Sequence, residues 1–423
     1  MNMTITAFTT EHPILEKKEK YGEDNIKMLN NYTRETLCSF AGKNAGICYM
    51  NGDYSSIENE GIEKSLKRFN NTIKSTHHSI ADHCFVTVVF ENVPKFFAMI
   101  MNSFQFYNTS EKSARYTKMK NLSSVEGELY YKWYDNINKE LIIKYNIDED
   151  QANKIAQENA RYFISIFSPS TTFSYTTSIR QWNYIYIWFK RFLDERNVVN
   201  ITITDFITKI VDECMTPFID WFETTALYID TIEEPKMREI DFIYQLYGRR
   251  YFENTRYGNS DAYFDSYKVN YEVSFASLAQ LQRHRTIKYV INDFKCCKDQ
   301  FYIPDIVKEN DNLLNEWMSD MKRVSYLYPQ GLMVQVAEFG TIDNFLLKCD
   351  ERLCGRAQLE TMNNVKEILR RFYYSKGMSN YSHDKVLEWF DNDRIKAKCE
   401  MRPGGCYDIG CIHGPLHATE RLF

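Results

Sequence analysis

The feature that most limits the possible folds is an order of elements that occurs twice. Residues 57–76 carry apolar side chains at helical spacing, and residues 85–93 (FVTVVFENV) are rich in the β-branched and aromatic residues of strands. The same order returns at 240–257, which is predicted to be helical, and at 267–275, which alternates like a strand. The two occurrences lie roughly 180 residues apart, which indicates a weak internal repeat.

A second pair of segments supports this repeat. Residues 160–191 and 324–352 each contain an apolar stretch, a proline, a polar β-like middle and a helix that ends in basic residues. Residues 195–235 interrupt the pattern and contain the expected boundary. A chain of 423 residues has room for two such units. The predicted divisions are a first half at 1–205, a second half at 206–390 and a Cys/His-rich tail at 391–423.

Composition excludes two classes of protein. The longest apolar runs, 96–101 and 185–189, are far too short to span a bilayer, and the first residues do not resemble a signal peptide. We therefore expect a cytoplasmic protein, or one of the host cytoplasm if a virus encodes it. A net charge of -5 argues against a nucleic-acid polymer as partner, so local arginines must hold any bound phosphate. Eleven cysteines in such a chain are expected to be reduced.

The basic triplet Arg283-His284-Arg285 follows an apolar, helix-like run. A triplet of this kind on a helix is usually a solvated face. Residues two apart on a helix project about 200° from each other, so the two arginines could not share a ligand there. At a helix end they could serve two neighbouring anionic ligands, and two phosphorylated ligands are the sharper hypothesis.

A polar segment in the first half has two interpretations. In an extended chain Glu111, Ser113 and Arg115 project to one face and present an acceptor, a hydroxyl and a guanidinium, a set that suits a nucleotide phosphate. In a helix Glu111 and Arg115 would form an ordinary ion pair, and the residues alone favour that alternative.

Two clusters of possible metal ligands stand out. His77, His78 and His83 fall within seven residues, where zinc binding is conceivable and a hydrogen-bonded cluster is the simpler alternative. The tail offers Cys399, Cys406 and Cys411, followed by two histidines. A structural zinc there competes with free, reduced thiols.

Four short motifs then point to one family. They are H-x-S-x-x-D-H at 77–83, S-x-R-Y at 113–116, R-H-R at 283–285 and R-x-C-x-R-A-Q-x-E at 352–360. Together they resemble the signatures of the flavin-dependent thymidylate synthases (ThyX). In that family R-H-R runs directly into S-x-N-E-x-S-x-R-Y. In this chain the first half has 103–105 (SFQ) in place of R-H-R, whereas the second half keeps R-H-R and has lost the polar residues after it. The chain therefore resembles two fused copies of the family core, an α+β pseudo-dimer of antiparallel sheets with helices.

The resemblance implies a composite nucleotide site, one for each pair of halves. Arg352 and Arg283 are the implied catalytic residues, with Arg352 against the uracil carbonyl. Arg161 has no counterpart in the second half, where the matching residue is Ser325. The implied dUMP ligands are Glu111, Ser113, Arg115 and Arg161 from the first half and Gln280, Arg283 and Arg352 from the second.

The resemblance also implies FAD as cofactor. His77, Ser79 and Asp82 would lie near the flavin, and His284 and Arg285 would contact its phosphates or adenine. Asp82 stands where the family usually has Glu. The implied reaction is reductive methylation of dUMP to dTMP with methylenetetrahydrofolate and NADPH. A pyrimidine nucleotide hydroxymethylase and a nucleotide-binding pseudoenzyme or partner subunit are the alternatives. Because the family is tetrameric, we expect a homodimer of duplicated chains.

Overall fold

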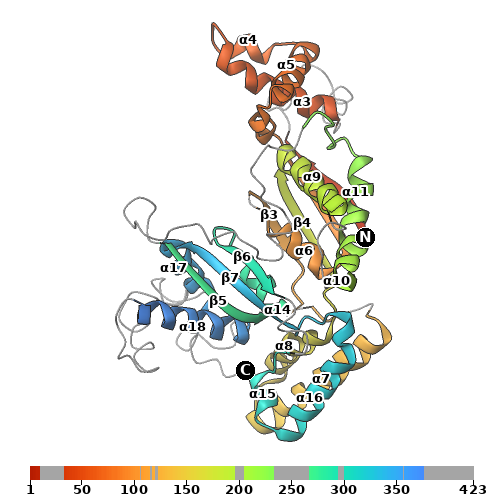
Figure 1. Cartoon of the computed structure of the whole chain (residues 1–423), viewed down its shortest axis with the longest axis vertical. Helices are drawn as coiled ribbons and strands as arrows, with labels where there is room; N and C mark the ends of the chain where they lie inside the picture. Colours follow the sequence, from red (N-terminus) through yellow and green to blue (C-terminus); the bar gives the residue numbers. More distant parts are fainter. Residues whose placement is uncertain are drawn as a thin grey trace. The chain divides into compact units, whose positions relative to one another are not determined.

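The chain forms two compact units. The computed structural model describes residues 1–9, 33–104, 106–114, 117–119, 122–195, 204–232, 266–293, 300–355 and 357–375 (Figure 1). Unit 1 comprises Met1–Lys112 and Thr171–Phe242, and unit 2 comprises Ser113–Ser170 and Ile243–Phe423. These units differ from the predicted halves, because helices that follow the first half's polar segment pack with helices of the second half. No described helix is both long and apolar enough to cross a membrane.

Unit 1 contains a four-stranded antiparallel sheet. Its order is β1 (Asn2–Phe8), β2 (Phe85–Val93), β4 (Thr171–Ser178) and β3 (Asn108–Glu111). The strand predicted at 85–93 is confirmed, and its alternating side chains enter the core. The strand β1 was not predicted.

An aromatic core lies between this sheet and its helices. The rings of Phe90 and Phe173 stack with centroids 4.8 Å apart, and Trp182 and Phe218 extend the cluster. The surrounding helical elements are α6 (Lys95–Met101), α9 (Ile179–Glu195), α10 (Thr204–Lys209), the π-helical η4 (Ile210–Met215) and α11 (Thr216–Glu223).

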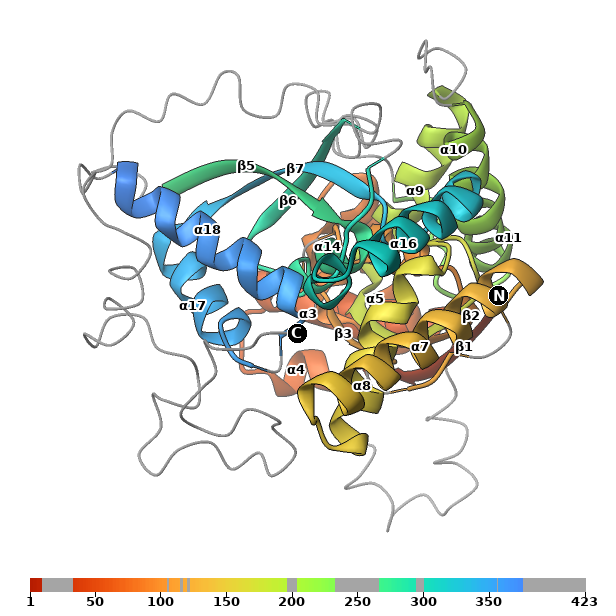
Figure 2. The same ribbon diagram turned by 90° about the horizontal axis from the view of Figure 1, so that it is seen from below.

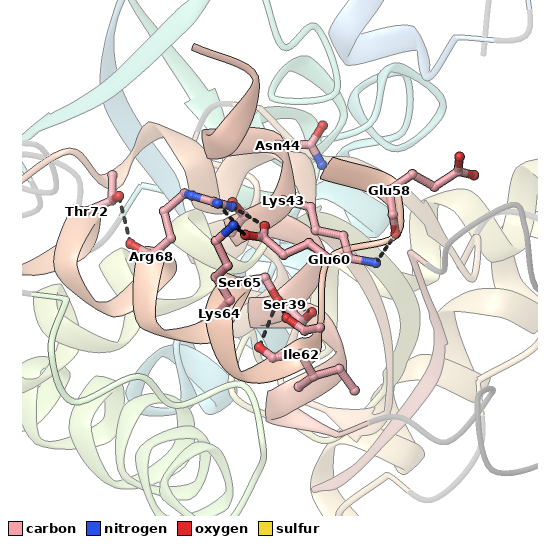
Figure 3. Close-up of polar contacts among 12 residues, drawn as sticks. Ser39, Lys43, Asn44, Glu58, Glu60, Ile62, Lys64, Ser65, Arg68 and Thr72 are labelled. Carbon is pink, nitrogen blue, oxygen red and sulfur yellow. Dashed lines mark hydrogen bonds and ion pairs between the residues drawn. The ribbon is translucent and has the colours of Figure 1, made fainter. Parts of the chain in front are cut away.

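A close helix pair precedes the sheet. It consists of α3 (Arg34–Gly46) and α5 (Ile62–Lys74), joined through the short η1 (Ile47–Tyr49) and α4 (Ser55–Glu58). The helix predicted at 57–76 is thus confirmed in its central part. The hydroxyls of Ser39 and Ser65 lie 2.7 Å apart where the helices cross, and Glu60 binds the guanidinium of Arg68 with both carboxylate oxygens at 2.6 Å (Figure 3).

Unit 2 contains a three-stranded antiparallel sheet in the order β5 (Ser266–Ser274), β7 (Met333–Thr341) and β6 (Lys288–Asp293). The strand predicted at 267–275 is confirmed within one residue at each end. The helix α14 (Phe275–Leu281) follows β5 directly. Figure 2 shows α17 (Ile342–Arg352) and α18 (Leu359–Ser375) side by side against this sheet.

A helical layer completes unit 2. It contains α7 (Ser124–Tyr145), α8 (Glu149–Ala160), α15 (Asp305–Lys308) and α16 (Asp311–Val324). Trp133, Phe163 and Trp317 pack together in this layer, and the Nε1 of Trp133 donates to the Oδ2 of Asp320 at 3.0 Å. The 3₁₀ turns η3 (Arg161–Phe163) and η5 (Ser325–Leu327) follow α8 and α16.

Three strands of the unit 1 sheet, β2, β4 and β3, have the same order and register as β5, β7 and β6 of unit 2. In unit 1, Tyr175 of β4 lies between Val88 of β2 and Thr109 of β3. In unit 2, Glu338 of β7 lies between Val269 of β5 and Tyr289 of β6. Each sheet therefore places its last strand in sequence between the two strands that precede it.

A symmetric crossing joins the segments after α8 and α16 within unit 2. Ser165 and Pro329 form an antiparallel bridge. The N–H of Ile166 donates to the carbonyl of Tyr328 at 3.0 Å, and the N–H of Gln330 donates to the carbonyl of Ile164 at 2.8 Å. If the two segments are exchanged so that Ser165 takes the place of Pro329, Ile166 corresponds to Gln330 and Tyr328 to Ile164. The two hydrogen bonds are then equivalent.

Candidate functional site

Three of the predicted dUMP ligands are linked by hydrogen bonds in unit 2, and two of them bind Gln358, a residue without a predicted role. The carbonyl oxygen of the Gln358 side chain, Oε1, accepts hydrogen bonds from Nη2 of Arg161 and from Nε2 of Gln280, the latter at 2.8 Å. Arg352, in the last turn of α17, donates Nη2 to the backbone carbonyl of Gln280 at 3.0 Å. We call Arg161, Gln280, Arg352 and Gln358 the Gln358 cluster.

A buried carboxylate lies next to the Gln358 cluster. Glu360, in the first turn of α18, accepts from the N–H and hydroxyl of Ser274 at 2.7 and 2.6 Å and from the hydroxyl of Tyr162 at 2.7 Å. Burial raises the pKa of Glu360, while these hydrogen bonds and the charge of Arg161 oppose the rise. The side-chain nitrogen of Gln358 donates to the same tyrosine hydroxyl, so the two groups are directly linked.

Local structure explains why these residues meet. Arg161 and Tyr162 sit in η3, where the chain leaves α8. Gln280 projects from α14, which begins at a cap formed by the hydroxyl of Ser274. Gln358 immediately precedes α18 and folds back on Gln280 through its backbone N–H, which lies 3.4 Å from the Oε1 of Gln280.

The basic triplet lies just beyond the C-terminus of α14. Because α14 ends at Leu281, the alternative of a solvated helix face is wrong for Arg283 and Arg285. The N–H of Arg283 donates to the carbonyl of Gln280 at 3.2 Å. Arg285 is exposed, whereas Arg283 is half-buried.

His284 between these arginines is held neutral. Burial, reinforced by the charges of Arg352 and Lys348, lowers the pKa of His284 to about 2. Its Nε2 is buried and has no hydrogen-bond partner among the residues that the structure describes. A neutral imidazole beside several cations can donate to, or accept from, a bound ligand without adding charge.

A buried ion pair connects α17 to the central strand β7. Lys348 binds Glu338 of β7, and both side chains are fully buried. The hydroxyls of Tyr267 and Tyr271 each donate to the Glu338 carboxylate at 2.6 Å. The proximity of Glu338 contributes to raising the pKa of both tyrosines, after burial as the main cause. Lys348 lies one helical turn before Arg352, so this pair fixes the part of α17 that carries Arg352.

The polar segment of the first half is extended. Glu111 ends strand β3, so the helical alternative is wrong for this residue. In unit 1 its Oε1 accepts from the Nζ of Lys95 at 2.6 Å and from the hydroxyl of Thr171 at 2.9 Å. Ser113 is half-buried and its carbonyl accepts from the N–H of Thr117 at 3.0 Å. Arg115 lies outside the described residues.

The histidine-rich segment forms the 3₁₀ turn η2 (His78–His83) in unit 1, directly before β2. His77 and Ser79 are exposed. Asp82 accepts from the hydroxyl of Ser178 and from Nη1 of Arg180, both at 2.7 Å. The Nδ1 of His78 lies 3.0 Å from the hydroxyl of Tyr184.

No metal-ligand cluster of three or more His, Cys, Asp or Glu residues occurs in the part of the chain that the structure describes. Of the three histidines in the His77–His83 segment, His78 lies within hydrogen-bonding distance of Tyr184. The predicted zinc ligands Cys399, Cys406 and Cys411 lie outside the described residues, and zinc binding by the tail stays a prediction.

Comparison with known proteins now adds the family. Residues 28–190 match the family Thy1, thymidylate synthase complementing protein. This part of the chain is similar to the Thy1 family, and the match covers less than half of the 423 residues. The match includes His77, Glu111 and Arg161, so the matched region contains the helix pair of unit 1 and one residue of the Gln358 cluster, Arg161. No curated protein matches the chain.

Solved structures give distant matches. A UMP/dUMP methylase, PolB from Streptomyces cacaoi bound with 5-Br dUMP, is 12% identical over 44% of this chain and 76% of its own, with a TM-score of 0.29. Thymidylate synthase X from Helicobacter pylori with FAD and dUMP is 13% identical over 55% of this chain and 100% of its own, with a TM-score of 0.28.

Proposed function

We propose that this protein is a flavin-dependent enzyme that binds dUMP and methylates its uracil ring to give dTMP, with methylenetetrahydrofolate as carbon donor and NADPH as reductant. The Thy1 match supports the family. The observation that carries the proposal is the hydrogen-bonded Gln358 cluster: Arg161 and Gln280 bind Gln358, and Arg352 binds the backbone of Gln280. Arg161, Gln280 and Arg352 were predicted as dUMP ligands from separate parts of the sequence.

We also propose that the chain is a duplicated Thy1 core. Its support is the shared register of the two sheets and the symmetric crossing at Ser165 and Pro329. The exchange that relates Ser165 to Pro329 relates Arg161 to Ser325. One of the two equivalent positions has therefore lost its guanidinium, as expected if a single composite site functions in each chain.

In this proposal the arginines divide two tasks. The guanidinium of Arg161 binds the dUMP phosphate, together with Ser113 and Arg115, through charge-assisted hydrogen bonds. Arg352 lies against the uracil carbonyl, where its charge stabilises the negative charge that develops as carbon 5 becomes nucleophilic. Arg283 is a second cation beside the uracil ring, and Gln280 orients the ring. Glu111, in unit 1, is held by Lys95.

Each unit carries polar groups of the kind that bind FAD. His284 presents a buried Nε2 without a partner among the described residues, and the exposed Arg285 beside it can contact a phosphate. In unit 1, His77 and Ser79 are exposed donors, and Asp82 orients Arg180. When bound, a reduced flavin supplies the hydride and carries the one-carbon unit.

Product analysis tests the proposal directly. The protein is incubated with FAD, dUMP, methylenetetrahydrofolate and NADPH, and the nucleotide product is identified by mass spectrometry. dTMP is expected, and the Arg352→Lys variant is expected to form it much more slowly because a point charge replaces the planar guanidinium. A hydroxymethylated product would change the reaction assigned to the site. Nucleotide binding without any product would favour a pseudoenzyme.

The assembly is proposed from the same duplication. Two chains would combine four cores into a homodimer. Light scattering of the purified protein is expected to give twice the mass of one chain, and a monomer that forms dTMP would contradict this arrangement.

A further inference from the structure

The hydrogen bonds around Gln358 form one continuous chain between two unlike ends. At one end, Arg161 can only donate, because a guanidinium has no acceptor. It donates to the Oε1 of Gln358, the nitrogen of Gln358 donates to the hydroxyl of Tyr162, and that hydroxyl donates to Glu360. The chain ends at a carboxylate that also receives two hydrogen bonds from Ser274.

The acceptor at position 360 and the donor-only guanidinium of Arg161 impose the same direction on every bond in this chain. A carboxylate that receives the tyrosine proton leaves the hydroxyl oxygen to accept from Gln358. The amide of Gln358 must then turn its nitrogen toward Tyr162 and its oxygen toward Arg161. A donor at position 360 would allow the hydroxyl of Tyr162 to donate to the oxygen of Gln358. The amide nitrogen of Gln358 would then face the guanidinium of Arg161, and two donors would oppose each other.

The same orientation serves the other ligands of the Gln358 cluster. The Oε1 of Gln358 accepts from Gln280 as well as from Arg161, and the backbone carbonyl of Gln280 accepts from Arg352. Glu360 is 4% exposed, Gln358 is 1% exposed and Arg161 is 5% exposed, so water has little access to replace a lost partner.

We propose that Glu360 is a positioning residue of the nucleotide site: acting through Tyr162 and Gln358, it holds the Arg161 guanidinium and the Gln280 amide in the orientation that binds dUMP. Glu360 does not touch the nucleotide. This inference rests on the proposed function, in which Arg161 and Gln280 are dUMP ligands.

The substitution Glu360→Gln tests the direction of the chain. Glutamine has nearly the shape of glutamate, but its amide can donate to Tyr162 and so allows the reversed order. The dissociation constant for dUMP, measured by calorimetry, is expected to rise about tenfold, the effect of weakening one charge-assisted hydrogen bond. Tyr162→Phe interrupts the chain and should weaken binding to a similar degree.

A double-mutant cycle separates this role from a loss of packing. If both substitutions act through one chain, the double variant Glu360→Gln/Tyr162→Phe should bind dUMP no more weakly than either single variant. Asp320→Asn is the matched control, since Asp320 is also a buried carboxylate of unit 2 that accepts from an aromatic N–H. It should lower stability and leave dUMP affinity unchanged. Wild-type affinity in Glu360→Gln, or additive losses in the double variant, would overturn the proposal.

Failure of the proposed function gives a different result. If the wild-type protein does not bind dUMP, the function is wrong, and crystal structures of the wild type and Glu360→Gln then test positioning alone. Separation of the Arg161 guanidinium from Gln358 in the variant is expected. An unchanged Arg161–Gln358 pair would refute the role of Glu360.

Discussion

The two sheets offer a comparison at one central position. Tyr175 of unit 1 and Glu338 of unit 2 occupy the same place in the register, and both are fully buried. Tyr175 stacks on Tyr107 with centroids 4.9 Å apart and donates its hydroxyl to the carbonyl of Met101 at 2.9 Å. Glu338 instead accepts from two tyrosines and from Lys348.

One arrangement of strands is therefore compatible with two kinds of core. Unit 1 buries aromatic surface, which needs no partner beyond one carbonyl. Unit 2 buries a charge, which is tolerated only because a cation and two hydroxyls surround it. The cation is on α17, the helix that carries Arg352. The core with the buried charge therefore belongs to unit 2, where Lys348 holds α17 in the position that places Arg352 in the candidate site.

The largest expected effect comes from breaking the buried ion pair. Lys348→Met leaves the Glu338 carboxylate without its cation and should lower the free energy of unfolding by about 3–5 kcal/mol. The double variant Glu338→Gln/Lys348→Met removes both charges and should recover most of this loss. Tyr175→Phe in unit 1, which loses one neutral hydrogen bond, should cost about 1 kcal/mol. Urea denaturation measures all three. Equal losses from Lys348→Met and Tyr175→Phe would remove the contrast between the units.

The next effect concerns Arg161 and its equivalent Ser325. Arg161→Ala should weaken dUMP binding about ten- to a hundredfold, because a charge-assisted contact of roughly 1.5–3 kcal/mol is lost. Ser325→Ala is the control at the equivalent position and should leave the affinity unchanged. Calorimetric titration with dUMP compares the two. A loss in Ser325→Ala as large as in Arg161→Ala would show that both equivalent positions contribute.

A smaller effect is expected at the helix pair of unit 1. A Cβ at Gly42 would lie 2.0 Å from the carbonyl oxygen of Ser65, so Gly42→Ala must push α3 and α5 apart. The expected cost is about 1–3 kcal/mol of unfolding free energy. Gly61→Ala is the control, because a Cβ at Gly61 meets no atom within 4 Å. Thermal unfolding that is equally affected by both substitutions would contradict the close crossing seen in Figure 3.

The smallest effect is a pH dependence from His284. The folded protein keeps this imidazole neutral down to about pH 2, whereas in the unfolded chain it takes up a proton near its ordinary pKa of 6.5. Below pH 6.5 the unfolded state therefore binds more protons, and the unfolding free energy should fall by about 1.4 kcal/mol per pH unit from this residue. His284→Asn should remove that part of the slope between pH 6 and 5. The relevant measurement is the urea midpoint at each pH. An unchanged slope would mean that His284 takes up its proton in the folded protein too.

Short-range patterns predicted much of this fold. The strands at 85–93 and 267–275 are evident because β-branched and aromatic residues alternate or cluster there. The helical alternative for Glu111 was wrong because β3 is fixed by pairing with β4, whose residues lie about 60 positions further along the chain. Local spacing contains no information about such a partner.

The site was predicted in part. Arg161, Gln280 and Arg352 were identified through the family resemblance, and in the structure hydrogen bonds link them through Gln280 and Gln358. Gln358 and Glu360 were visible as part of A-Q-x-E but had no assigned role. Tyr162 gave no signal, since it looks like an ordinary aromatic residue of an apolar run. Its role depends on partners 196 and 198 residues away, Gln358 and Glu360.

The symmetric crossing at Ser165 and Pro329 has a consequence for how the protein responds to dilution. A self-complementary contact between separate chains dissociates as their concentration falls, because its formation is bimolecular. In this protein both sides of the crossing belong to one chain, and the connecting polypeptide sets their effective concentration. The contact therefore persists at any protein concentration. Each side is also encoded separately, so a change on one side is not copied to the other.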